Sequence, residues 1–210
     1  MWQRFQEAIA EHVREQFSIY LLVTMVFTAG IAAGALSVRF LEEIQVRELN
    51  DFFFGFVDYL SERQPINQGL IMQRALLQNG IFVLALWVLG NLFFGIIPVL
   101  GILFYRGFTI GFSVGFLAEQ NSLRGVLFAI GAILPQNLIY VPMTILSSVC
   151  AVIFSLILLR RRFAGKVIPY GSYLFQYSLL MLIVAALFAL GSIVEAIITP
   201  VFMRAVVTVL

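Results

Sequence analysis

Two long apolar runs constrain this chain more than any other feature of its sequence. Residues 75–105 and 125–159 carry no charged side chain over 31 and 35 positions. About 20 apolar residues are enough to cross the bilayer core as a helix. Both runs are continuous and lack the alternation of apolar and polar residues that marks membrane β-strands. They therefore predict an all-α, polytopic membrane protein and exclude a membrane β-barrel.

The composition agrees with this class and excludes several others. Of the 210 residues, 61% are hydrophobic and 11% are charged, whereas soluble domains carry about 25% charged residues. A soluble enzyme, a disordered chain and a nucleic-acid-binding module are excluded, and a net charge of +2 is too small to capture nucleic acid. With one cysteine and one histidine, we expect no metal, no cofactor and no enzymatic activity.

We expect a single integral membrane domain over residues 1–210 with about five spans. In order, the predicted segments are a cytoplasmic amphipathic helix (1–17), span 1 (18–38), an extracytoplasmic amphipathic loop (39–78), a kinked span 2 (79–104), a short span 3 (107–123), a broken span 4 (125–159), a basic cytoplasmic loop (160–172), span 5 (173–194) and a carboxyl-terminal tail (195–210).

The orientation follows from the strongest basic cluster, which consists of Arg160, Arg161, Arg162 and Lys166. The positive-inside rule places this cluster in the cytoplasm, together with the amino terminus and a turn at 105–107. The 39–79 loop, the 119–124 turn and the carboxyl terminus then lie outside. If the segment 107–134 re-enters the membrane instead of crossing it, this parity changes.

Small residues at four-residue intervals predict where helices pack most tightly. Gly30 and Gly34 lie one turn apart in span 1, and Gly107, Gly111 and Gly115 form a two-step ladder on one stripe of a helix. Such stripes let two helix backbones approach closely within a membrane.

Prolines predict two irregular places inside the apolar runs. Pro98 predicts a kink near 95–98. Leu134, Pro135, Gln136, Asn137 and Pro142 predict a broken helix. Because irregular backbone is tolerated at membrane depth only against protein or water, this break should face the interior of the bundle.

The charges next to the spans are hypotheses for function, since an intramembrane charge usually has one. The candidates are Arg106, Glu119, Arg124 and Glu195. We place the first three at the membrane interfaces. We expect Glu195 near the outer interface, with a proton or ion site as the alternative.

The loop over 39–79 contains an amphipathic helix with an aromatic face. Phe52, Phe53 and Phe56 belong to apolar positions at helical spacing. The face could lie on the bilayer, pack within the protein or dock on a partner.

The central stretch carries a set of family-like markers. They are the bent segment with Gly95 and Pro98, Arg106-Gly107-Phe108, Gly111, Gly115-Phe116-Leu117, Gly125, Leu134-Pro135-Gln136-Asn137 and Pro142. On these markers the chain resembles the stage II sporulation protein M family, strongly over about 90–162 and loosely elsewhere. Gln136 and Tyr140 stand where the wider family often has histidine and glutamate, which is similar to the branch from endospore-forming bacteria.

The resemblance implies a non-enzymatic scaffold in the mother-cell membrane at the sporulation septum. Its implied partners are two peptidoglycan-degrading proteins, stage II sporulation proteins D and P, together with the lipid bilayer, no nucleic acid and a possible homo-oligomer. The scaffold would localise these hydrolases for septal wall remodelling and engulfment of the forespore. The alternative is a small transporter or channel whose polar path uses Asn91, Gln136, Asn137 and Glu195.

Overall fold

The computed structural model describes residues 16–61, 66–164 and 170–207, with the side chains at 61, 120–124, 164 and 207 excepted. Every regular element within these ranges is helical: α2 (Phe17–Ser37), the 3-10 turn η1 (Val38–Phe40), α3 (Glu43–Ser61), α4 (Gln68–Gly90), α5 (Ile96–Ala164) and α6 (Tyr170–Val207). The predicted all-α polytopic class is confirmed. The helix predicted over 1–17 falls almost entirely outside the described residues.

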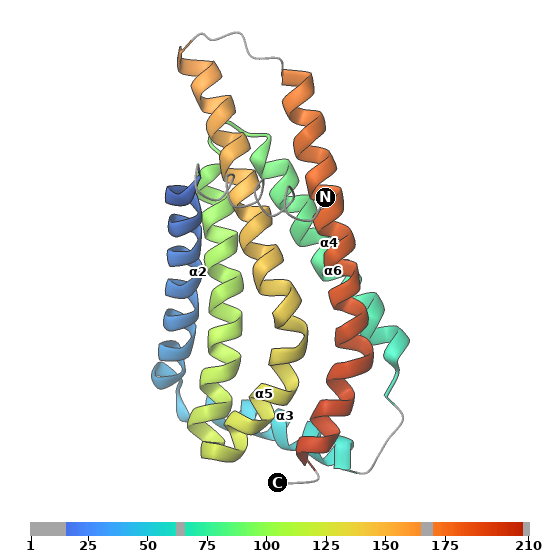
Figure 1. Ribbon diagram of the computed structural model, residues 1–210. Coiled ribbons are helices and arrows are strands. Elements are labelled where there is room, and N and C mark those ends of the chain that lie inside the picture. The colour runs from blue at the N-terminus through green and yellow to red at the C-terminus, as the bar shows by residue number, and fades with distance from the viewer. Residues whose placement is uncertain (1–15, 62–65, 165–169, 208–210) are drawn as a thin grey trace.

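The helix α5 is a hairpin rather than one straight rod. Its backbone is helical throughout, but Figure 1 shows the chain reversing at the lower end of the bundle. We call Ile96–Glu119 the first arm and Gly125–Phe163 the second arm. With α2, α4 and α6 they make five helices long and apolar enough to cross a membrane. The first arm runs the full height of α2 in Figure 1 and is long and apolar enough to cross, which favours a full span over the re-entrant alternative for 107–134.

The predicted boundary between spans 2 and 3 is wrong. Helix α4 ends at Gly90 and α5 begins at Ile96, so the reversal lies at 91–95 and not at 105–107. The predicted spans 79–104 and 107–123 are displaced accordingly. The number of candidate spans stays at five, and the start of α2, the 91–95 reversal and the upper ends of the second arm and α6 lie toward the same end of the bundle in Figure 1.

The residues around this reversal explain its position. A Cβ at Gly95 would collide with the Leu89 carbonyl oxygen, so only glycine permits the close return of the chain. Pro98 lies in the first turn of α5, where a missing N–H costs no helical hydrogen bond. The Ser155 hydroxyl donates to the Leu92 carbonyl at 2.7 Å and ties the reversal to the second arm.

The predicted break in span 4 is also wrong, because α5 passes through Pro135 and Pro142 without interruption. The side-chain amides of Gln136 and Asn137 donate to the carbonyls of Ala132 and Ile133, each at 2.7 Å. Pro135 removes the N–H partner of the Gly131 carbonyl, and the two amides contact the carbonyls that follow it along the helix. Proline is tolerable inside a membrane helix where neighbouring groups compensate in this region.

The last span is longer than predicted. Helix α6 continues from Tyr170 to Val207, so neither the end at 194 nor a separate tail over 195–210 is correct. At 1.5 Å per residue its 38 residues extend about 57 Å, more than the ~30 Å hydrocarbon core. Figure 1 shows the surplus, where the upper ends of the second arm and α6 project together beyond the other helices.

The closest helix contact joins α2 to the first arm. Each of five glycines would place an added Cβ against the backbone of the opposite helix: Gly30 against Phe104, Gly34 against Phe108, Gly107 against Phe27, Gly111 against Ile31, and Gly115 against Ala35. The two glycine motifs therefore face each other, and the backbones touch where any larger residue would hold them apart. The predicted tight packing is confirmed by this contact.

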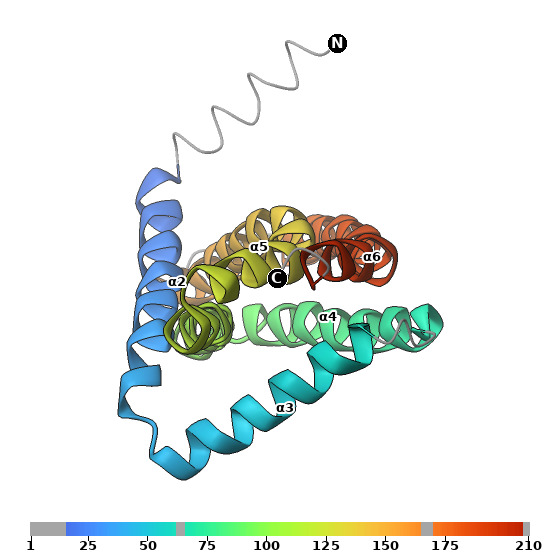
Figure 2. The ribbon, with the colours of Figure 1, turned by 90° about the horizontal axis from the view of Figure 1, so that it is seen from below.

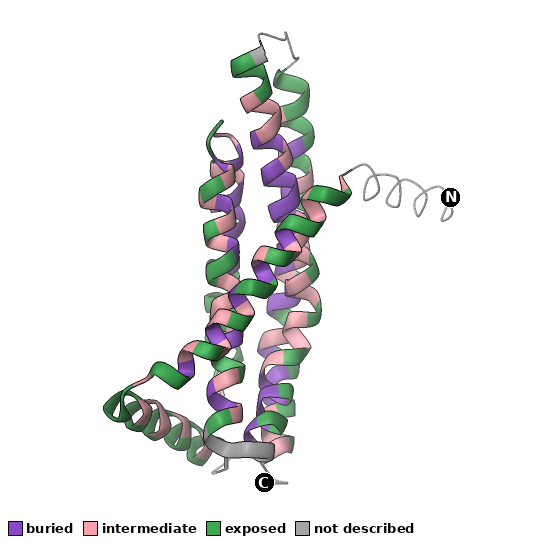
Figure 3. Cartoon of the chain, turned by 90° about the vertical axis from the view of Figure 1, so that its left-hand side faces the viewer, coloured by how far each residue is buried: buried purple, intermediate pink, exposed green. Residues whose placement is uncertain are grey.

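The described core has two parts. The larger fills the space between α2, α4, α5 and α6, and the smaller lies at the lower end around Phe116 and Phe128. Figure 2 shows α3 lying across this lower end, away from the axis of the bundle. Figure 3 shows buried positions toward the interior and exposed positions along the outer faces. The exposed faces are rich in large apolar side chains, as a lipid-facing surface requires.

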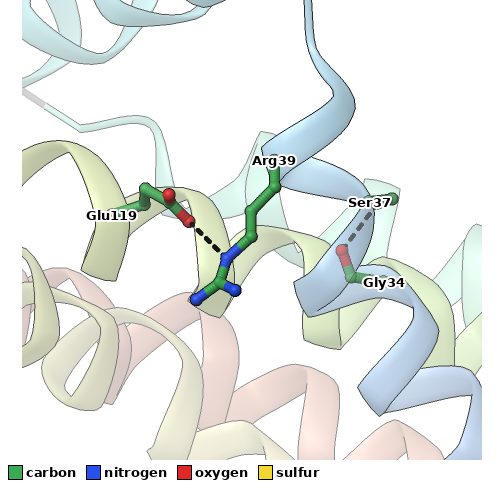
Figure 4. A network of polar contacts seen from close by, with 4 residues as sticks. All are labelled: Gly34, Ser37, Arg39 and Glu119. Atoms are coloured by element: carbon green, nitrogen blue, oxygen red, sulfur yellow. Dashed lines mark hydrogen bonds and ion pairs between the residues drawn. The ribbon is translucent and has the colours of Figure 1, made fainter.

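The lower end of α2 is held to the first arm by a surface contact as well. Arg39 Nε lies 3.8 Å from Glu119 Oε2, with both side chains largely exposed. In the preceding turn the Ser37 hydroxyl donates to the Gly34 carbonyl at 2.7 Å (Figure 4). An exposed pair of this kind contributes at most about 1 kcal/mol, so the glycine contact dominates.

Replacing Gly111 with leucine should separate α2 from the first arm. The new side chain would meet the Ile31 backbone, and overpacking of this kind costs about 1–3 kcal/mol. We expect a lower thermal unfolding midpoint in detergent and a lower level in the membrane. Gly101→Leu is the matched control, since nothing lies within 4 Å of its added Cβ in the same helix. Equal stability of the two variants would refute the contact.

Candidate functional site: a polar cluster in the centre of the bundle

Five polar side chains from four different helical segments meet in the middle of the bundle. Helix α4 contributes Asn79, the first arm Arg106, the second arm Tyr140, and α6 Ser192 and Glu195. We call these residues the central polar cluster. Asn79 is the midpoint of α4, and Arg106 lies near the midpoint of the first arm. The cluster therefore lies far from either end of these spans.

The cluster is joined by hydrogen bonds. Arg106 Nη2 donates to Asn79 Oδ1 at 2.8 Å, and Asn79 Nδ2 donates to Ser192 Oγ at 3.3 Å. The Tyr140 hydroxyl donates to Glu195 Oε2 at 2.7 Å and lies 3.2 Å from Ser192 Oγ. Ser192 in turn donates to the Phe188 carbonyl at 3.0 Å. The network thus connects a cation on the first arm to a carboxylate on α6.

Aromatic rings surround the guanidinium. The Arg106 Cζ atom lies 4.2 Å from the Phe82 ring centroid, 5.1 Å from that of Phe188 and 5.7 Å from that of Tyr140. A desolvated cation–π contact contributes about 2 kcal/mol or more, and a charged hydrogen bond about 1.5–3 kcal/mol. Together these are comparable with the ~2.5–3.5 kcal/mol that insertion scales assign to a charge at the helix centre.

A cavity of about 470 Å³ adjoins the cluster. Asn79, Arg106, Tyr140 and Glu195 line it from within, together with the amide side chains of Gln136 and Asn137. We call it the central cavity. The Thr199 hydroxyl donates to Gln136 Oε1 at 2.8 Å and holds that amide in place. The prediction that the residues 134–137 face the interior is therefore correct for two of them, while Leu134 is 52% exposed.

Asn91, the fourth polar residue of the predicted path, lies elsewhere. It accepts a hydrogen bond from the Tyr170 hydroxyl at 3.2 Å and lines a separate hollow with Arg161 and Arg162. This hollow and the central cavity share no lining residue. Fully buried Leu86 and Val149 lie between them along α4 and the second arm.

The two charges of the cluster correct the predictions made for them. Arg106 is inside the bundle and not at an interface, because Asn79 and three aromatic rings satisfy it there. Glu195 is likewise inside, because Tyr140 reaches it from another helix. Glu119 is at the lower end, as expected, and the Arg124 side chain lies outside the described part.

Asn79, Tyr140 and Ser192 are members that sequence reasoning missed. One signal could have revealed the cluster: Arg106 is a solitary charge between two apolar stretches, 75–105 and 107–118. A charge near the middle of a membrane helix needs polar or charged partners on other helices. Which residues supply them depends on packing.

The predicted aromatic face divides in the structure. Phe53 packs inward, with its ring centroid 5.2 Å from that of Phe128. Phe52 is 78% exposed and Phe56 is at the boundary of exposure at 36%. Arg160, Arg161 and Arg162 lie at the projecting upper end of the second arm, and Lys166 lies outside the described residues.

Metal-binding groups do not gather in the described part of the chain, where no three His, Cys, Asp or Glu residues come together. The arrangement is thus a hydrogen-bonded polar site with opposite charges and a cavity, built inside a five-span helical membrane bundle.

The class defined by this fold and site is a polytopic α-helical membrane protein with a polar centre. Residues 23–200 match the family described as stage II sporulation protein M. The chain belongs to this family and is a sporulation-related membrane protein. No curated protein and no solved structure matches it.

Replacing Tyr140 with phenylalanine should destabilise the bundle. The change leaves Glu195 without its hydrogen bond from another helix, at a cost of about 1–3 kcal/mol. We expect a lower thermal unfolding midpoint in detergent micelles. Tyr105→Phe is the control, because Tyr105 lines the same cavity but is 67% exposed. Indistinguishable midpoints would show that the network contributes nothing to stability.

Proposed function

We propose that this chain is a non-enzymatic membrane scaffold that localises peptidoglycan-degrading partners at the sporulation septum. The resemblance implies stage II sporulation proteins D and P as these partners. The scaffold holds the hydrolases where septal wall is remodelled, so that the mother-cell membrane can engulf the forespore. Membership of the stage II sporulation protein M family supports the sporulation setting.

The observation that carries the scaffold role is the placement of α3. This helix lies across the lower end of the bundle, which the basic cluster at the opposite end assigns to the outside. Its inner face, with Phe53 and Leu60, is anchored on the lower core. Phe52 and Phe56 are exposed on one flank of the helix, and Phe54 is exposed on the other. An anchored helix with exposed aromatic side chains outside the membrane suits a protein that docks wall-degrading partners.

A transporter or channel is the second candidate, and the central cavity is the observation in its favour. A conducting path would have to connect this cavity to both sides of the membrane. The hollow near Asn91 shares no lining residue with it, and buried core lies between them. The scaffold therefore has the stronger support.

The proposed orientation makes a labelling prediction. In a Cys150→Ser background, we expect Phe52→Cys to react with a membrane-impermeant thiol reagent from outside intact protoplasts. Phe93→Cys, in the 91–95 reversal, and Arg162→Cys should react only in inverted vesicles. Tyr105→Cys should react in neither, because the first arm is in the membrane there. Reaction at position 52 only in inverted vesicles would show that the orientation is opposite to the one proposed.

The partner surface makes a second prediction. Affinity purification of the tagged protein from detergent-solubilised sporulating cells should recover peptidoglycan hydrolases, identified by mass spectrometry. The double change Phe52→Ala and Phe56→Ala should lower that recovery about tenfold or more, since a central aromatic contact contributes about 2 kcal/mol.

The matched control removes two exposed apolar side chains from the outer faces of spans, at Ile97 and Leu182. It should leave recovery unchanged at equal membrane levels. Equal recovery of hydrolases with both double variants would show that α3 is not the docking surface. If the wild-type protein recovers no hydrolase, the proposed scaffold role is refuted.

A further inference from the structure

With the five candidate spans placed across a bilayer, the central cavity opens between α4 and the first arm toward lipid. Its rim is formed by exposed side chains in the middle of membrane spans: Gln78 and Ile81 on α4, and Tyr105 and Thr109 on the first arm. Ile81 and Tyr105 are each 67% exposed. A molecule that enters between these helices at this depth has to arrive from within the membrane.

The interior of the cavity holds one cation and one anion that are not paired with each other. No ion pair within 4.0 Å links Arg106 and Glu195 in the described part of the chain. The guanidinium has five N–H donors, and it makes one hydrogen bond there, to Asn79. The Glu195 carboxylate, an acceptor with two oxygens, receives one from Tyr140. Each charge retains capacity toward the cavity.

This charge pattern complements a zwitterion. A phosphate is the group that a guanidinium binds best, through parallel N–H donors. An ammonium brings three N–H donors, which Glu195 and the amide oxygens of Gln136 or Asn137 can accept. A singly anionic headgroup would satisfy Arg106 but bring no positive charge of its own to Glu195. The cavity volume of about 470 Å³ is within the ~300–1,000 Å³ of ligand sites.

A second cavity indicates that the ligand carries an apolar chain. A hollow of about 350 Å³ between the two arms of α5 shares Ile110 and Asn137 with the central cavity. Apart from Asn137 its lining is aliphatic, with Val114, Val126 and Ile130 among the residues. A polar cavity adjoining an apolar one matches an amphiphile better than a water-soluble zwitterion.

We propose that the central cavity binds the headgroup of a phosphatidylethanolamine-type lipid. Arg106 holds the phosphate, Glu195 receives the ammonium, and part of an acyl chain occupies the hollow between the arms of α5. The site is independent of the scaffold role, because it lies inside the bundle and α3 contributes no residue to it.

The test is native mass spectrometry of the full-length, delipidated protein in detergent, titrated with dioleoyl phosphatidylethanolamine, phosphatidylglycerol or phosphatidylcholine. We expect one phosphatidylethanolamine to bind about tenfold more tightly than either other lipid, as a charged hydrogen bond provides. Glu195→Gln should abolish this preference. Glu119→Gln, which removes a carboxylate at the end of the bundle, is the control and should retain it.

Ala85→Leu is the second variant, because it fills the cavity while both charges remain. It should weaken phosphatidylethanolamine binding about tenfold. Thermal unfolding in detergent verifies that each variant is folded before titration. Bound lipid should also raise the unfolding midpoint of the wild type more than that of either cavity variant.

Several results would overturn the proposal. Equal binding of phosphatidylethanolamine and phosphatidylglycerol would show that the cavity does not recognise a zwitterion. An unchanged lipid preference in Glu195→Gln, or unchanged binding in Ala85→Leu, would show that the lipid does not bind in this cavity. Soluble phosphoethanolamine that binds as tightly as the lipid would indicate a solute site. Loss of hydrolase recovery in both cavity variants, without any lipid binding by the wild type, would assign the cavity to a partner's membrane helix.

Discussion

The backbone contact between α2 and the first arm of α5 is the constraint on which the rest of the structure depends. Glycines on both helices bring the two backbones together, and each would collide with the other helix if it carried a Cβ. Within the described residues, α2 makes extensive contact with no other span. Because lipid supplies no hydrophobic drive for helix association, such close packing has to provide it. The contact also positions α3, which follows α2 along the chain.

The polar centre is the second organising feature, and it depends on helices far apart in the sequence. Asn79 and Ser192 are 113 positions apart, and Tyr140 and Glu195 are 55 apart. Each would be costly in hydrocarbon by itself, and together they supply one another with hydrogen bonds while Arg106 and Glu195 keep capacity toward the cavity. They also join α4, both arms of α5 and α6 at one level. A site that stabilises the bundle and adjoins a cavity combines a structural role with the proposed ligand role.

The sequence predicted much of the fold and less of the site. The helical class, the number of spans, the tight glycine packing and the 119–124 reversal are all present in the structure. The errors share one cause, since each prediction treated a charge or a proline as a helix end. Arg106 suggested a turn, and Pro135 suggested a break. Arg106 is instead satisfied by Asn79 from another helix, and α5 continues through Pro135.

By itself, the sequence determined that this chain must be a helical membrane protein, because its charge-free runs admit no other way to satisfy their backbone groups. It also determined which helix faces could approach most closely, since that depends only on the spacing of small residues. Only the tertiary structure decided where the charges lie. Whether Arg106 and Glu195 belong at an interface or in the centre depends on partners from other helices. Those partners are brought into reach by packing, which no local pattern records.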